Sequence, residues 1–523
     1  MSNQARANSE SQSSMGNRIE KAHETQNDDK TMQDEPIRYE AVGLFDEEVE
    51  DVQMYNKGGL HPTHLGDILD GRFEVVHKLG SGGFGIVWLC HDTTTKKWRA
   101  VKVMSADHSS DGEISIYEYL RGKASAEQLE ANHLAIPSES FWLDGPNGRH
   151  LCFVMPVLGY SIDRWRLRLD STKEQTAALV QSGCRQIVQA VHFLHSNGIC
   201  HSDLKPQNVL MKIHGLDEMD KEQVMELLDE PELIEVETVS GDPPQPRAPE
   251  YLVCALPSSW CYSLITDSVA IVDFGESFFA NNPPKKPGHT PSYAAPEVYF
   301  EGSGEPGFSS DIWSLACTIF EIRDGNPLFN SLSTEGLYRC TRDLEFFLGA
   351  LPEPFRTARS NMINAIVGLP SESDSGDLDS GSKSEESKSH DTEELDPVAY
   401  TREDLRRIRD KKIEGTSYST VMEAVLGRER NRRILPDDDD EEEIFIKYRF
   451  PQEGVIQLSK LLEKMLKYHP SERITIDQVL EDPWISPQPS FPSTPKSSAR
   501  RDIHLFLSIF TTALIVSIAL AVS

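Results

Sequence analysis

The sequence predicts an α+β fold of two lobes, a small β-rich lobe followed by a larger helical lobe, and three patterns predict it. Apolar residues alternate on both sides of a glycine-rich stretch at residues 79–87, as in antiparallel strands joined by a turn. A buried strand at residues 150–155 then runs into a bend at Pro156. Further along, apolar residues recur at helical spacing, at positions 180, 184, 187, 191 and 194. We therefore expect the small lobe at about residues 70–156 and the helical lobe at about residues 157–486.

The two lobes are expected to form one domain at residues 55–486, interrupted by disordered acidic insertions at about residues 212–267 and 370–443. Residues 1–54 are rich in Ser, Asn, Gln and Glu, so they are predicted to be disordered, with no sign of a secretory signal.

The chain of 523 residues is strongly acidic. Its 52 Lys and Arg stand against 84 Asp and Glu, which gives a formal net charge of −32. This charge disfavours direct contact with the phosphate backbone of a nucleic acid and is compatible with basic peptide partners, although solvated acidic loops explain most of it equally well. The eight cysteines are scattered without a C-x-x-C pair, which predicts free thiols in a reducing compartment.

The glycine-rich stretch contains the pattern G-x-G-x-x-G at Gly80, Gly82 and Gly85. The pattern alone is weak because dinucleotide-binding folds also use it, but there the glycines open a helix. Here Val87–Cys90 continues as a strand, so we expect a hairpin turn whose backbone N–H groups can approach phosphates without a Cβ in the way. The residues expected around the nucleotide here are Leu79, Gly80, Ser81, Gly82, Gly83, Phe84, Gly85, Ile86 and Val87.

The strand and the helix that follow carry a lysine and a glutamate. Lys102 has apolar neighbours on both sides and is the candidate ligand of the α- and β-phosphates; the alternative, an exposed strand lysine, is disfavoured by those neighbours. A helix predicted at residues 113–120 should supply a glutamate that holds Lys102. Glu113 shares a face with the apolar residues of this helix and is preferred over Glu118.

The stretch at residues 201–210, His-Ser-Asp-Leu-Lys-Pro-Gln-Asn-Val-Leu, brings a carboxylate, an ammonium group and a carboxamide together on one loop. Phosphoryl transfer needs a carboxylate that orients the attacking hydroxyl and an oxygen ligand for Mg²⁺. Asp203 suits the first role and Asn208 the second, while Lys205 can meet charge that develops on the γ-phosphate. A polar surface turn is the alternative reading of these loop residues.

Later segments complete this set of polar residues. An apolar strand at residues 269–272 ends in Asp273-Phe274-Gly275, which places Asp273 to bind the same Mg²⁺. Asp311 begins a buried helix and is expected to hold the backbone of the loop around Asp203. Ala295-Pro296-Glu297 closes the intervening segment, and Arg473 is the expected buried partner of Glu297.

These ordered motifs resemble the eukaryotic protein kinases. More narrowly, they resemble the SR-protein-specific serine/threonine kinases of fungi, in the CMGC group, because of Gly58-Gly59-Leu60-His61-Pro62, Leu65-Gly66-Asp67, Ser202 and the spacer before Asp273. The resemblance covers about residues 55–486 apart from the insertions. It implies the bilobal kinase fold and a non-specific serine/threonine protein kinase that uses ATP and Mg²⁺, acts on Arg/Ser-rich basic segments and has a link to splicing-factor or mRNA-processing regulation. It also implies nucleotide contacts from Ala100, Met155, Val157, Leu158 and Leu210, with Met155 as gatekeeper.

Ser202 stands where most regulated kinases have an arginine that pairs with a phosphate on the activation segment. In this chain that segment is the stretch between Asp273 and Glu297. Serine cannot form that charge-assisted bond, so activity is predicted not to depend on phosphorylation of the segment. The alternative function is a catalytically weak pseudokinase scaffold tethered to a membrane, since a fold alone does not prove an activity.

Two regions outside the motifs have a distinctive composition. The acidic run Asp437–Glu443 is a candidate docking surface for basic substrates. A Pro/Ser linker at residues 487–502 leads to a segment at 503–523 whose part from Leu505 on is uncharged and, as a helix, about 28 Å long, close to the roughly 30 Å core of a bilayer. Arg500 and Arg501 precede it, so we expect a tail anchor on the cytoplasmic face of an intracellular membrane; a helix packed on the kinase lobe, in a cytoplasmic or nuclear protein, is the alternative.

Overall fold

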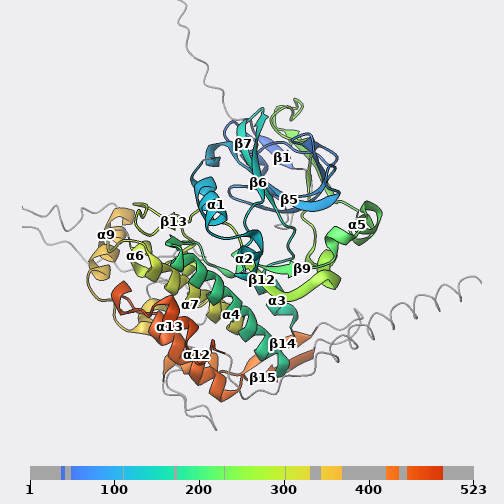
Figure 1. The fold of residues 1–523 in the computed structure, drawn as a ribbon. Helices are drawn as coiled ribbons and strands as arrows, with labels where there is room; N and C mark the ends of the chain where they lie inside the picture. The colour runs from blue at the N-terminus through green and yellow to red at the C-terminus, as the bar shows by residue number, and fades with distance from the viewer. Residues whose placement is uncertain are drawn as a thin grey trace, which may run out of the picture.

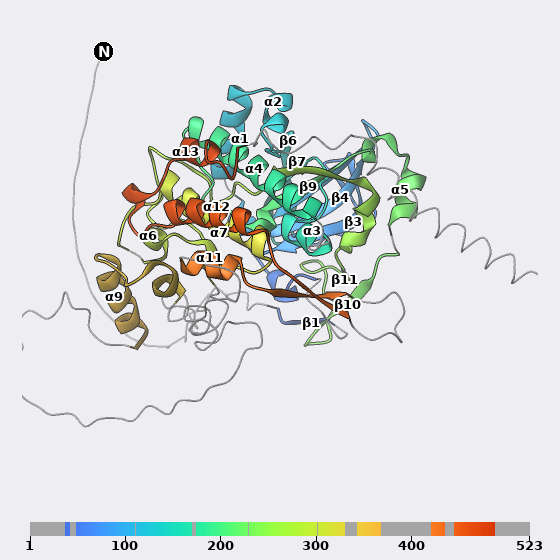
Figure 2. The same cartoon turned by 90° about the horizontal axis from the view of Figure 1, so that it is seen from below.

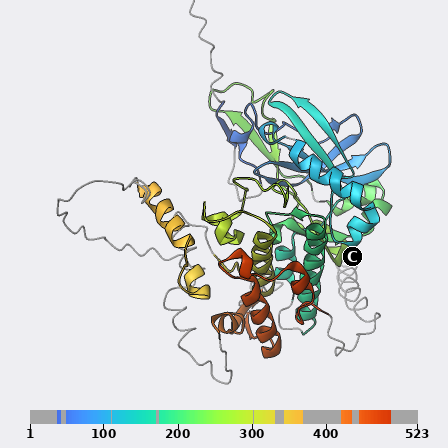
Figure 3. The same ribbon diagram turned by 60° about the vertical axis from the view of Figure 1, so that its left-hand side comes forward.

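The computed structural model describes residues 37–41, 49–109, 111–169, 174–228, 230–300, 302–329, 343–367, 420–434 and 444–486. A β-rich lobe lies above a larger helical lobe, as Figures 1 and 3 show. The predicted α+β, two-lobed fold is therefore confirmed.

The small lobe is built on one six-stranded antiparallel sheet in the order β2-β3-β4-β5-β7-β6. Its strands are β2 (Ile68–Leu69), β3 (Phe73–Gly82), β4 (Gly85–Asp92), β5 (Lys97–Met104), β6 (Glu139–Gly145) and β7 (Gly148–Met155). The helix α1 (Asp111–Lys123) packs on the sheet, since Ile116, Tyr117 and Leu120 share a core cluster with Phe153 of β7. A shorter helix, α2 (Ala126–Ala131), follows it and begins with a capping box at Ser125.

The large lobe surrounds two long helices, α4 (Glu174–Ser196) and α7 (Phe308–Asp324), which pack against each other (Figure 2). The five apolar positions that predict α4 are all fully buried. The other elements of the large lobe are α3 (Ile162–Arg168), α6 (Pro296–Tyr299), α9 (Phe355–Val367), α11 (Val421–Leu426), α12 (Gln452–Met465), α13 (Ile476–Leu480) and the paired strands β14 (Arg430–Ile434) and β15 (Ile444–Tyr448). Two small sheets pair β8 (Ile199–Cys200) with β13 (Phe278–Phe279) and β9 (Val209–Ile213) with β12 (Ile265–Ile271).

The insertion predicted at about residues 212–267 is folded, which corrects the expectation of disorder there. It contains α5 (Lys221–Leu227), β10 (Leu233–Thr238), β11 (Tyr251–Val253) and a 3-10 turn, η5 (Ser258–Leu264). The strand β1 (Tyr39–Ala41) pairs with β10, so part of the N-terminal segment predicted as disordered also belongs to the fold. The physical reason is that apolar residues interspersed in this acidic stretch, including Val224, Val236, Leu252 and Leu264, are buried against the small lobe.

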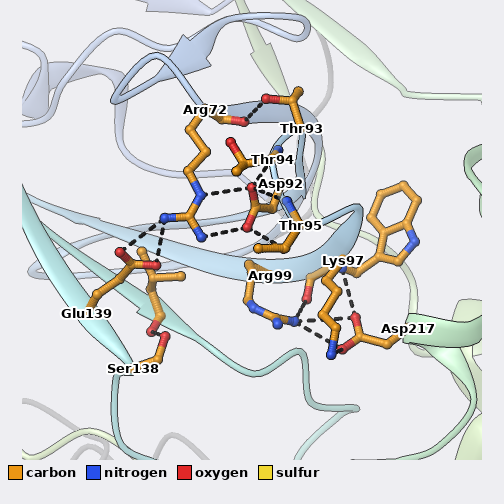
Figure 4. Close-up of polar contacts among 12 residues, drawn as sticks. Arg72, Asp92, Thr93, Thr94, Thr95, Lys97, Arg99, Ser138, Glu139 and Asp217 are labelled. Carbon is orange, nitrogen blue, oxygen red and sulfur yellow. Dashed lines mark hydrogen bonds and ion pairs between the residues drawn. The ribbon is translucent and has the colours of Figure 1, made fainter.

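The insertion covers the outer face of the small lobe next to the connection between the lobes. Leu216, Val224 and Leu256 lie in one apolar cluster with Trp98 of β5 and Val157 of the connection. Figure 4 shows the polar contacts at the edge of this cluster. Asp217 accepts a hydrogen bond from the backbone N of Trp98 at 2.9 Å and forms an ion pair with Arg99 at 3.2 Å. On the same sheet Arg72 binds Asp92 through two nitrogens, at 2.8 and 2.7 Å. The contacts of Asp217 fix the position of the insertion on the sheet, whereas the Arg72–Asp92 pair joins two segments of the small lobe itself.

The described residues contain no helix that is long and apolar enough to span a bilayer. The predicted tail at residues 503–523, its linker at 487–502 and most of the second insertion, including Asp437–Glu443, lie outside the described residues.

Candidate active site

The loop at His201–Asn208 follows β8, ends in the 3-10 turn η3 (Pro206–Asn208) and is bound by a residue of α7. The backbone N–H groups of His201 and Ser202 each donate to the carboxylate of Asp311 at 2.8 Å. Asp311 is 1% exposed, and His195 lies 3.0 Å from it. Ser202 takes a left-handed backbone conformation with φ of 72°, which is uncommon outside glycine. The predicted structural role of Asp311 is confirmed.

Asp203 is the centre of a polar cluster on this loop. Lys205 Nζ lies 2.5 Å from Asp203 Oδ2, and the hydroxyl of Thr290 donates to Asp203 Oδ1 at 2.9 Å. Asn208 Nδ2 donates to the backbone O of Asp203 at 2.8 Å and to its Oδ2 at 3.0 Å. Because the amide nitrogen of Asn208 is committed to Asp203, the amide oxygen is the atom that Asn208 can offer to a metal ion.

Lys102 of β5 and Asp273, which follows β12, form an ion pair between the two lobes. Lys102 Nζ lies 2.8 Å from Asp273 Oδ1. Burial by itself lowers the pKa of Lys102, but the charges of Asp273 and Glu113 outweigh it and raise that pKa. Burial raises the pKa of Asp273, and the ammonium group of Lys102 more than reverses this, so the net shift is downward. Both groups are therefore held in their charged forms.

Glu113 is buried behind this pair, 8% exposed, and accepts a hydrogen bond of 2.5 Å from the hydroxyl of Tyr117. Burial raises the pKa of Glu113, while Lys102 lowers it. In the described part of the chain Lys102 has its ion pair with Asp273, and Glu113 is not within 4.0 Å of it. The expected direct Lys102–Glu113 contact is thus replaced by a longer-range attraction. Glu118, the competing choice, is exposed to solvent.

The glycine turn between β3 and β4 leaves its backbone accessible. A Cβ placed on Gly80, Gly82 or Gly83 would meet no atom within 4 Å, so these glycines are not required by internal packing. A Cβ on Gly85 would lie 2.3 Å from the backbone O of Val103, so Gly85 is required for the turn to lie against β5. The turn therefore leaves room for a phosphate group close to its backbone.

The other residues expected around a nucleotide lie either near the connection between the lobes or in the core clusters. Ala100 pairs directly with Met155 across β5 and β7, and Leu210 pairs with Ser161 next to the connection between the lobes. Val87 and Leu158 are half-buried, and Leu79 packs on the edge of the insertion cluster. The side chains of Ile86 and Val157 are buried in core clusters, so a nucleotide contact from either residue would have to come from its backbone. Side chains alternate along a strand, and a continuous stretch of expected contacts ignores that alternation.

Glu297 and Arg473 form the predicted buried pair. Two nitrogens of Arg473 bind the two oxygens of Glu297, both at 2.7 Å, and both side chains are fully buried. Glu297 also accepts from the hydroxyl of Ser310 at 2.8 Å. The end of the activation segment is therefore anchored on the large lobe.

A small hollow lies beside Asp203 and is lined by residues of the activation segment and of α7, among them His289, Thr290, Tyr293 and Ser310. Thr290 belongs to the site, since its hydroxyl contacts both Asp203 and Lys205, the latter at 3.0 Å. The sequence did not point to it. Tyr117 is another such residue. Its position four residues after Glu113 is the helical spacing of neighbouring side chains, whereas nothing local to Thr290 indicates its contact with Asp203.

A family model described as protein kinase domain matches residues 73–227 and 262–485. SRSF protein kinase 3 of Homo sapiens is 35% identical over 174 residues, which cover 32% of this chain and 30% of that protein. Protein kinase dsk1 of Schizosaccharomyces pombe is 36% identical over 180 residues, covering 33% and 32%. Serine/threonine-protein kinase SRPK of Physarum polycephalum is 26% identical over 470 residues, covering 86% and 94%. The matched part thus spans only about a third of the first two relatives and most of the third.

Proposed function

Because this chain belongs to the protein kinase domain family, we propose that it transfers the γ-phosphate of ATP to serine or threonine hydroxyls of proteins. The observation that carries the proposal is the convergence of two polar pairs, Lys102 with Asp273 and Asn208 with Asp203. The pairs are joined where the backbone N of Val272, next to Asp273, donates to the O of Asn208 at 3.0 Å. These groups come from separate segments, and each has the chemistry that phosphoryl transfer requires.

In this mechanism the residues of the site have distinct tasks. Asp273 and the amide oxygen of Asn208 would hold Mg²⁺, Lys102 would bind the α- and β-phosphates, and the backbone at Gly80–Gly83 would cover the phosphates. Bound Mg-ATP supplies the phosphoryl group and an electrophilic phosphorus. Asp203 orients the acceptor hydroxyl and takes its proton, and Lys205 stabilises negative charge next to it.

The proposed substrates are Arg/Ser-rich basic segments. Two relatives bear names that refer to SRSF proteins or to SRPK, and a chain with a net charge of −32 is electrostatically suited to a basic peptide. By the same reasoning we propose a role in regulating splicing factors or mRNA processing. Serine or threonine is favoured over tyrosine as the acceptor, because Lys205 and Thr290 flank Asp203. The comparisons give no support to the alternative of a weakly active scaffold.

The direct test is transfer of radiolabelled phosphate to three peptides of equal length, with Arg/Ser, Lys/Ser and Arg/Tyr repeats. We expect the purified full chain with Mg²⁺ and ATP to label the Arg/Ser peptide most strongly. Equal labelling of the Arg/Ser and Lys/Ser peptides would remove the proposed substrate class and leave the kinase activity. No labelling of any peptide or protein, together with no binding of Mg-ATP, would overturn the kinase proposal itself.

Activity is predicted to persist after phosphatase treatment. In the structure the position before Asp203 is Ser202, and its backbone is already held by Asp311, so the loop is ordered without a phosphate–arginine contact. We expect kcat to stay within about twofold after phosphatase treatment and removal of the phosphatase, with mass spectrometry as the check on dephosphorylation. A loss of turnover that returns on rephosphorylation of the activation segment would contradict this.

We further propose that residues 503–523 anchor the chain on the cytoplasmic face of an intracellular membrane. The uncharged stretch from Leu505 and the preceding Arg500 and Arg501 support this. Deleting residues 505–523 should move the protein from the membrane pellet to the soluble fraction of a cell extract. Equal fractionation of the full and shortened chains would exclude the anchor and leave the cytoplasm or nucleus.

A further inference from the structure

The segment Gly58–Leu60 lies outside the site described above, yet it is bound to the turn η2 (Ala106–His108) between β5 and α1. The backbone N of Ala106 donates to the O of Gly59 at 2.9 Å, and the N of Asp107 donates to the O of Gly58 at 2.7 Å. On the other side, Asn147 binds the segment twice: its O accepts from Gly58 N at 2.7 Å and its Nδ2 donates to the O of Leu60 at 2.7 Å. Four hydrogen bonds thus fix the segment between η2 and the β6–β7 turn.

Glycine is required at two positions of this segment. Gly58 has φ of 86°, and a Cβ there would lie 2.3 Å from a carboxylate oxygen of Asp107. A Cβ on Gly59 would lie 1.8 Å from the backbone O of Met54. A side chain at Gly59 would clash with backbone and displace the segment. At Gly58 the clash is with the carboxylate end of the exposed Asp107 side chain, which can rotate away, so the cost there is the strain of a left-handed backbone.

The other side of η2 contacts the glycine turn. Ser105, which precedes η2, donates its backbone N–H to the O of Phe84 at 2.8 Å. The rings of Phe84 and His108 lie 4.8 Å apart between centroids and are inclined by 51°. Nδ1 of His108 is 2.9 Å from the hydroxyl of Ser105, which orients the imidazole. Phe84 is at the tip of the turn and 45% exposed, so these contacts with Ser105 and His108 provide the packing of the tip.

We propose that His108 and the segment Gly58–Leu60 are positioning residues for the glycine turn: the segment fixes η2, and η2 holds the tip of the turn through Phe84. On the other side of the tip, Gly80, Gly82 and Gly83 have open space around them, so no packing there holds the turn. A turn that is held in place before a ligand arrives loses less conformational entropy on binding, which tightens the complex. The effect on nucleotide affinity rests on the proposed function, whereas the effect on the mobility of the turn does not.

The first test replaces His108 by Ala, an exposed position where the fold should be preserved. We expect faster hydrogen exchange at residues 80–86 and an increase of about three- to tenfold in both the Kd of Mg-ATP and the KM for ATP, the size expected for loss of an aromatic pair. The kcat and the KM for peptide should change by less than about twofold. A merely misfolded fraction would lower kcat and leave the KM for ATP unchanged. His108→Phe should restore wild-type behaviour.

The matched control is His91→Ala. His91 is another histidine of the small lobe in contact with an aromatic ring, that of Trp98 at 5.1 Å, but it is remote from the glycine turn. Its loss should leave the exchange of residues 80–86 and the ATP constants at wild-type values. If His91→Ala and His108→Ala have equal effects on the turn, or if His108→Ala has none, the inference is wrong.

The second test compares Gly58→Ala with Gly66→Ala. Both glycines have a left-handed backbone, with φ of 86° and 89°, but a Cβ on Gly66 meets nothing within 4 Å. The two variants therefore carry the same backbone strain, but only Gly58 is hydrogen-bonded to η2, through its O and the N of Asp107, so only Gly58→Ala transmits the strain to η2. We expect faster exchange at residues 80–86 in Gly58→Ala alone. Equal exchange in the two variants would overturn the role of the segment. If the wild-type chain bound no Mg-ATP, the proposed function would fail, but these exchange comparisons would still decide the inference.

Discussion

Replacing Asp203 by Asn should lower kcat by about 10²- to 10⁴-fold, the range expected when a general base is removed. Asn keeps the shape of the side chain and can still accept the hydrogen bond from Thr290, but it cannot take the proton of an acceptor hydroxyl. The Kd of Mg-ATP should stay within about threefold, because Asp203 is not one of the proposed metal ligands. Single-turnover transfer to an Arg/Ser peptide and equilibrium binding of a fluorescent ATP analogue measure the two quantities separately.

The control for this experiment is Glu118→Gln, which removes one carboxylate from an exposed position of α1. It should keep wild-type kcat, and both variants should melt at the wild-type temperature. If Asp203→Asn kept kcat within about threefold of the wild type, another group would have to be the base, and the assignment built on the cluster of Asp203, Lys205 and Thr290 would be wrong.

Motifs contained within one stretch of sequence are the part of the site that local pattern predicts well. The residues of the loop around Asp203 are fixed by their spacing, and the helical periodicity before it predicts five positions that are all buried in α4. Glu113 is distinguished from Glu118 in the same way, because only one of them shares the buried face of α1. These are short-range relations that the period of a helix or the geometry of a turn determines.

Contacts between distant segments could not be predicted in this way. Whether Lys102 pairs with Asp273 or with Glu113 of α1 depends on where these two residues lie in the folded chain. The contact of Thr290 with Asp203 depends on how the activation segment returns to the loop. Composition also leads to a wrong prediction of disorder where an acidic segment contains enough apolar residues to form a core. The insertion before Asp273 is acidic overall, but a small number of apolar side chains, with Val224 and Leu252 among them, are enough to fold it onto the small lobe.

Replacing Arg473 by Met should lower the free energy of unfolding by about 3–5 kcal/mol, the cost of leaving a buried charge without its partner. Glu297 is fully buried, and in the variant its remaining side-chain partner would be Ser310. Urea unfolding followed by tryptophan fluorescence is a suitable measurement, because the guanidinium of Arg473 lies 5.1 Å from the ring of Trp313. The double variant Glu297→Leu, Arg473→Met should recover much of the loss, since it removes both charges.

The exposed pair Lys97–Asp217 is the control for this prediction. Its side chains are 51% and 35% exposed and its atoms are 3.8 Å apart, so Lys97→Met should cost at most about 1 kcal/mol. If Arg473→Met also lowered the free energy of unfolding by at most about 1 kcal/mol, the Glu297 carboxylate would have to be hydrated or protonated in the variant. The end of the activation segment would then be free to move. The hydroxyl of Ser310 binds Glu297, and the adjacent Asp311 holds the loop of Asp203. A large loss of stability at the Glu297–Arg473 pair should therefore also lower kcat, whereas Lys97→Met should leave kcat unchanged.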